Sequence, residues 1–128
     1  MRLDEFVFAA LTDDAAVGAI ISDRCYPRKL PQSPTLPAIT YSIITEVPTE
    51  ANTQLSDCRI QLDCWAMTYT GSRALAVAAK NALRYYRRSD GGNTVLSIYE
   101  ANQQDDDDDE RQIYRQIVDV IAMYHESE

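Results

Sequence analysis

Five consecutive aspartates, Asp105–Asp109, are the residues of this chain that most resemble a chemical site. Carboxylate oxygens are the ligands that Ca²⁺ and Mg²⁺ prefer, and a fixed Mg²⁺ would support hydrolysis. A calcium-binding loop, however, alternates its ligands, contains a central glycine and ends in a spaced glutamate, and an uninterrupted run has none of these features. Such a charge block is typical of a solvated loop. We therefore expect no metal site. A small acid-rich hydrolase stays an alternative that an ion-binding titration would test.

The other reactive residue types lack the partners that catalysis requires. His125 is the one histidine of the chain and lies near its end, a poor platform for a Ser-His-Asp or Cys-His arrangement. Cys25, Cys58 and Cys64 do not show zinc-ligand spacing and are interpreted as core thiols. Gly91-Gly92 lacks the lysine and hydroxyl of a phosphate-binding loop. The sequence therefore predicts no enzyme activity and no cofactor.

The charge pattern argues against binding to duplex DNA. The net charge is −8 at pH 7, whereas the DNA backbone recruits clustered lysine and arginine. The segment Arg84–Arg88 is basic and aromatic, a composition that contacts nucleic acid. We prefer the interpretation that its cations interact with the dipole of a helix that ends there.

Targeting signals are also absent from the sequence. Acidic residues near Met1 stand where a signal peptide needs basic ones. No apolar run approaches the ~18 residues of a membrane span. The sequence thus predicts a cytoplasmic, reduced protein without a membrane span.

The segment from Cys58 to Arg88 predicts a strand that continues directly into a helix. Alternate residues from Cys58 to Ala66 face one way, which is the period of a strand with one face in a core. From Thr68 the apolar residues recur at helical spacing. The Thr68 hydroxyl is suited to cap the first turn of this helix.

The remaining elements predict one domain, residues 1–128, with an α+β fold. The order α-β-β-α-β-β indicates a mainly antiparallel sheet of four to five strands with two helices packed on one face. The expected N-terminal helix covers residues 2–11 and restarts through Ile21, with Asp13 or Asp14 as the cap of the second part. The expected strands are a short edge strand Cys25–Arg28 in a proline-rich connection, Ala38–Val47, Thr94–Ala101 and Gln112–Tyr124. The expected connections are a hairpin tip Pro48–Asp57, a turn Ser89–Asn93 and a polar loop Asn102–Asp109.

The last strand is apolar on both faces. Val118, Val120 and Ala122 share one face, and apolar residues also occupy the other, beside Arg115 and Asp119. A sheet covered by helices on one side should be polar on the other. Either a loop or the N-terminal segment covers this second face, or the face contacts another subunit, which we favour. The candidate subunit or partner interface consists of Ile44, Ile113, Ile117, Ile121 and Met123.

Four pieces of the chain, in order, resemble a known family. They are the helix-like N-terminus, SDRCYPRKLPQSPTLPAITY (Ser22–Tyr41), QLDCWAMTYTGSRALAVAAKNAL (Gln61–Leu83) and YRQIVDVIAMY (Tyr114–Tyr124). Together they resemble the tail completion proteins of long-tailed bacteriophages over most of the chain. Gly71 departs from the family, in which an acidic residue often completes a capping box, and Cys25 stands where an aliphatic residue is usual. The aspartate run lies outside the family pattern.

The resemblance implies a structural virion protein without enzyme activity. Such proteins form rings, typically hexameric, at the head-proximal end of the tail tube, where they stop tube growth and help to join the tail to the head. The implied partners are further copies of the chain, the tail tube protein and the head-tail connector protein, with DNA passing through without specific binding. Asp105–Asp109 would then lie at a channel or rim. A head-tail connector component and a monomeric acidic accessory or inhibitor protein of a phage stay open as alternatives.

Overall fold

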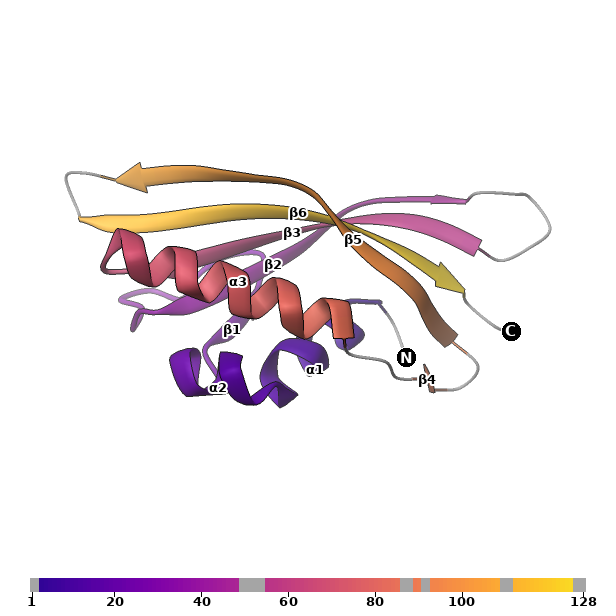
Figure 1. The fold of residues 1–128 in the computed structure, drawn as a ribbon, viewed down its shortest axis with the longest axis horizontal. Coiled ribbons are helices and arrows are strands. Elements are labelled where there is room, and N and C mark those ends of the chain that lie inside the picture. Colours follow the sequence, from indigo (N-terminus) through magenta and orange to yellow (C-terminus); the bar gives the residue numbers. More distant parts are fainter. Residues whose placement is uncertain (1–2, 49–54, 86–88, 91–92, 109–111, 126–128) are drawn as a thin grey trace.

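The computed structural model describes residues 3–48, 55–85, 89–90, 93–108 and 112–125. Within them, helices lie on one face of a single twisted sheet (Figure 1). The elements are α1 (Leu3–Asp13), α2 (Ala15–Ile21), β1 (Cys25–Pro27), β2 (Ala38–Pro48), β3 (Leu55–Ala66), α3 (Tyr69–Tyr85), β4 (Ser89–Asp90), β5 (Asn93–Asp108) and β6 (Ile113–His125).

The sheet has the strand order β1-β2-β3-β6-β5-β4. The pair β1–β2 is parallel, and every other neighbouring pair is antiparallel. The expected α+β class, the mainly antiparallel sheet and the helices on one face are confirmed. The two-residue β4 adds a sixth strand among the described residues. The N-terminal helical region restarts at Asp14, as expected, and its two parts α1 and α2 make three described helices rather than two.

Asp14 explains the division of the N-terminal region. Its backbone is extended, and its carboxylate accepts a hydrogen bond from the Val17 amide at 3.0 Å, which caps α2. Downstream, Arg24 donates through Nε to the Pro37 carbonyl at 2.9 Å. This bond ties the start of β1 to the far end of the proline-rich connection, so that β1 lies beside β2.

The step from β3 into α3 follows the expected capping pattern. The Thr68 hydroxyl accepts a hydrogen bond from the Gly71 amide at 3.0 Å. A Cβ atom on Gly71 would lie 2.8 Å from the Thr68 Oγ1 atom and 3.4 Å from the Ala66 Cβ atom. The tight approach favours glycine at the position where the resembling family often carries an acidic residue.

The core lies between the helices and the facing side of the sheet. Its largest fully buried side chains include Phe6 and Leu11 from α1, Leu62 from β3, and Leu75 and Leu83 from α3. Removing each such side chain from water contributes about 1.5–3 kcal/mol.

All three cysteines are buried thiols in this layer. Burial raises the pKa of Cys25 to about 12 and, together with the neighbouring Asp63, also raises the pKa of Cys64. The thiols of Cys25 and Cys64 therefore stay protonated at neutral pH, which suppresses nucleophilic and redox chemistry.

The acidic run does not form the predicted polar loop. β5 continues beyond Ala101 to Asp108, and Asp105–Asp108 pair with Gln116–Ile113 of β6. Aspartate disfavours strands, but a full-length partner strand supplies backbone hydrogen bonds that override this preference. β3 similarly begins at Leu55, inside the predicted hairpin tip. Asp109 and residues 49–54 lie outside the described residues.

Candidate assembly surface

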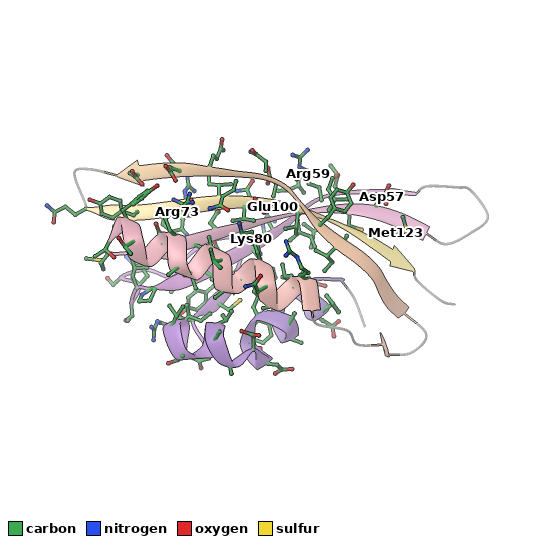
Figure 2. All side chains as sticks on the ribbon, in the orientation of Figure 1. Asp57, Arg59, Arg73, Lys80, Glu100 and Met123 are labelled. Atoms are coloured by element: carbon green, nitrogen blue, oxygen red, sulfur yellow. The ribbon has the colours of Figure 1, made fainter. Side chains whose placement is uncertain are left out.

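All the helices pack on one side of the sheet, and in the described part of the chain no element covers the other side (Figure 1). We call this side the uncovered face. It contains the odd-numbered residues of β3 from Asp57 to Trp65 and of β6 from Ile113 to Met123, with their neighbours on β2 and β5. Figure 2 shows Arg59 projecting from the sheet on the side away from the helices.

The uncovered face carries four of the five candidate interface residues. Ile113, Ile117, Ile121 and Met123 are all partly exposed there. The alternate residues Val118, Val120 and Ala122 are 0–2% exposed and face the core. The fifth candidate, Ile44, is 48% exposed but lies on β2, at a register shift between Ile43 and Thr45, and β3 separates it from the isoleucines of β6.

Charged and apolar side chains alternate across the uncovered face. Ile121 lies between Arg59 of β3 and Tyr99 of β5, and Tyr99 is 57% exposed. Arg59 in turn pairs with Asp119, with 3.4 Å between Nη2 and Oδ2. This mixture of partly exposed apolar residues and charges is typical of protein–protein interfaces, which are only about as apolar as the remaining surface.

A buried polar cluster anchors one end of the uncovered face. Asp63 is only 8% exposed although no helix lies over it, because Trp65 and Arg115 pack around it. The guanidinium of Arg115 lies 4.8 Å from the centre of the Trp65 ring and 3.8 Å from the Asp63 carboxylate, and it also pairs with Asp106. The Trp65 indole donates to Thr40 at 3.1 Å. This cluster therefore links β2, β3, β6 and β5.

A second polar cluster lies on the opposite side of the same strands, beneath α3. Gln116 is fully buried; its amide donates to Asp105 at 2.5 Å and its carbonyl accepts from Gln103 at 2.9 Å. Lys80 of α3 reaches Gln103 at 2.6 Å and Glu100 at 3.2 Å (Figure 2). The part of β5 that contains Glu100, Gln103 and Asp105 is thus held to α3 and β6 by polar contacts rather than by apolar packing.

Asp105–Asp107 are exposed, as expected for a solvated charge block, but two of these carboxylates have specific partners that the sequence interpretation did not include. Asp105 contacts Gln116, Tyr69 and Arg73 on the helix side, whereas Asp106 pairs with Arg115 on the uncovered face. Alternation along β5 sends the two carboxylates to opposite sides of the sheet. A sequence pattern alone does not reveal these partners, because they come from α3 and β6.

The remaining candidate positions form no catalytic constellation within the described residues. No three His, Cys, Asp or Glu residues there are placed to hold a metal ion. Arg84 is exposed in the last turn of α3, and residues 86–88 lie outside the described part. His125 ends β6 rather than a separate tail. None of the described helices is long and apolar enough to cross a membrane.

Comparisons with known proteins agree with this architecture. No curated protein matches the chain. A solved structure, the virion of a native gene transfer agent particle, contains a chain with a TM-score of 0.73 and 14% sequence identity, covering 94% of this chain and 92% of that one. At this identity the likeness establishes a shared fold. The family model for tail completion protein gp17 matches residues 5–125, and the chain therefore belongs to the tail completion protein gp17 family.

Proposed function

We propose that this protein is a structural tail component that forms a closed ring at the head-proximal end of a phage tail tube, ends tube growth and helps to join the tail to the head. The observation that carries the proposal is the family match over residues 5–125. In this role the protein acts by binding, without making or breaking a covalent bond. A ring of six subunits is the expected assembly.

The uncovered face is the surface that the proposal assigns to a subunit or to the tube. Ile117, Ile121 and Met123 are partly exposed on a side of the sheet over which no described element packs. Burying them in an assembly would remove apolar area from water, at about 25 cal/mol per Å². Trp65 and Arg115 lie on the same face, and these two residue types frequently dominate binding energy at interfaces.

The proposed partners are further copies of the chain, the tail tube protein and a head-tail connector protein. DNA would pass through the ring without specific binding. In the proposed ring, the acidic end of β5 lies at the rim or lines the channel, where the exposed Asp107 would repel the phosphates of passing DNA.

A tube-polymerisation assay tests this function. Tail tube protein would be polymerised with and without the purified chain, and tube lengths measured in micrographs. We expect short tubes of narrow length distribution with the wild-type chain and long tubes with Ile121→Asp. Val77→Asp is the matched control, because Val77 is 50% exposed on α3, away from the uncovered face. Unchanged tube lengths with the wild-type chain would contradict the proposal; binding to the connector alone would favour the connector alternative.

A further inference from the structure

The last part of β5, Asn102–Asp108, has the sequence NQQDDDD and contains no apolar side chain. We call these residues the strap. A register shift between Glu100 and Asn102 separates them from Ile98, which belongs to the buried core. Figure 1 shows β5 at the outer edge of the sheet, and beyond Thr94 its outer side has no strand partner in the described part of the chain. The hydrophobic effect therefore contributes little to holding the strap in place.

One continuous chain of hydrogen bonds connects the strap to α3 and β6. Lys80 donates to the side-chain oxygen of Gln103 at 2.6 Å, and the Gln103 amide donates to the side-chain oxygen of Gln116 at 2.9 Å. The Gln116 amide donates in turn to the Asp105 carboxylate at 2.5 Å. An ammonium can only donate and a carboxylate can only accept, so the two charged ends orient both amides. Bonds to charged groups are the stronger kind, and bonds in a chain polarise one another.

Other forces fix the strap on β6 only weakly. A strand that is polar on both faces has no apolar side to specify its register. Aspartate is disfavoured in strands, and consecutive carboxylates repel one another. Asp106 pairs with Arg115, and Asp105 lies 3.9 Å from Arg73, but such exposed ion pairs contribute little. The closed position of the strap therefore depends on the hydrogen-bond chain.

From these contacts we propose that the strap opens and closes as a unit while the rest of the fold stays intact. The register shift after Glu100 is its hinge, and the hydrogen-bond chain from Lys80 to Asp105 is its clasp. Lys80 also pairs with Glu100 at 3.2 Å, which holds β5 to α3 on the near side of the hinge (Figure 2). Segments with few buried apolar contacts open locally at a lower free energy than global unfolding requires.

The closed strap protects β6 from pairing with a second copy of the chain. It covers the outer edge of β6 from Ile113 to Asp119. This strand carries apolar residues on both faces, with Val118 in the core and Ile117 partly exposed on the uncovered face. A bare edge of such a strand is a template for aggregation, and charged side chains on an edge strand are a means of preventing it. The acidic run thus supplies a charged outer edge in place of an apolar one.

Hydrogen exchange of the native protein tests the local opening. The amides that pair the strap with β6 should exchange at a rate that low urea concentrations do not change, because a local opening exposes little surface. The amides of β3 around Ile60 and Leu62, which are fully buried, should exchange more slowly and at a rate that rises with urea. The same rate and the same urea dependence in both places would overturn the strap.

Gln103→Ala and Gln104→Ala form a matched pair of variants that tests the clasp. Gln103 is a link of the chain, whereas Gln104 is exposed and its side chain has no hydrogen bond within the described residues. Gln103→Ala should accelerate exchange of the strap amides roughly five- to thirtyfold, because the buried Gln116 oxygen loses its donor. Gln104→Ala should change that rate by less than about threefold. Equal effects of the two variants would overturn the clasp.

A disulfide that locks the strap tests its protective role. Gln104 and Ile117 are register partners, so Gln104→Cys together with Ile117→Cys places two thiols opposite each other. In low urea, thioflavin fluorescence should rise more slowly for the oxidised variant than for the same variant reduced, and faster for Gln103→Ala than for Gln104→Ala. Equal rates within either pair would overturn the protective role. None of these measurements involves tube capping, so their failure would leave the proposed function untouched.

Discussion

Truncating Asp105 should destabilise the fold, whereas truncating the neighbouring Asp107 should not. The Asp105 carboxylate accepts a hydrogen bond from the amide of Gln116, which is fully buried. Asp105→Ala leaves that donor without its acceptor, a loss that costs about 1–3 kcal/mol for a buried polar group. The lower value applies if a water molecule enters the space left by the carboxylate. Asp107 is exposed and forms no ion pair within the described residues, so Asp107→Ala should change the free energy of unfolding by less than about 0.5 kcal/mol.

Asp105→Asn separates the hydrogen bond from the charge. Its side-chain oxygen can still accept from Gln116. The variant loses the exposed pairing with Arg73, 3.9 Å away, which is worth at most about 1 kcal/mol, and the carboxylate oxygen that accepts a long, exposed hydrogen bond from the Tyr69 hydroxyl at 3.4 Å. Urea unfolding with a constant m-value measures all three variants against the wild type. The expected order of destabilisation is Asp105→Ala first, then Asp105→Asn, then Asp107→Ala. Equal stabilities of the two alanine variants would refute the reasoning that Asp105 supports a buried amide.

Three further predictions follow from the packing of individual side chains. Val120→Asp should prevent folding, because an unpaired charge in the core costs several kcal/mol. Ile121→Asp should keep a near-wild-type melting temperature. Equally low melting temperatures of the two variants would contradict the assignment of these residues to opposite faces of the sheet. Thr68→Ala should cost about 0.5–2 kcal/mol through loss of the α3 cap, with Thr68→Ser as the conservative control in thermal melts. The native Cys25 thiol should resist alkylation at pH 8, and rapid alkylation of the folded protein would contradict this. Because the pKa of Cys25 is raised to about 12 in the folded protein, only the unfolded chain releases the thiol proton between pH 9 and pH 12. The native state should therefore lose stability as the pH rises through that range.

Local patterns were sufficient to predict much of the fold. The change from period two to helical spacing at Thr68 correctly predicted β3 and α3, and an aspartate cap correctly predicted the second N-terminal helix at Asp14. Alternation along β6 separated Val118 and Val120 from Ile117 and Ile121, and the burial of these residues agrees with that separation. The assignment of the isoleucines to a subunit interface stays a prediction.

Contacts between strands distant in the sequence could not be predicted in the same way. The acidic run was interpreted as a loop because aspartate disfavours strands, yet pairing with β6 extends β5 through Asp108. The stacking of Arg115 on Trp65 and the bond between Gln116 and Asp105 depend on the registers of β6 with β3 and β5. Register is set by the whole sheet, and the periodicity of a single segment does not specify it.

The central claim is that this chain closes into a ring on the end of a tail tube. Negative-stain electron microscopy of the purified protein, alone and mixed with tail tubes, tests that claim most directly. We predict closed rings of uniform diameter, seated at one end of each tube, and fewer rings with Ile121→Asp than with Val77→Asp. Tubes with bare ends, together with light scattering that shows only monomers at every concentration, would contradict the account.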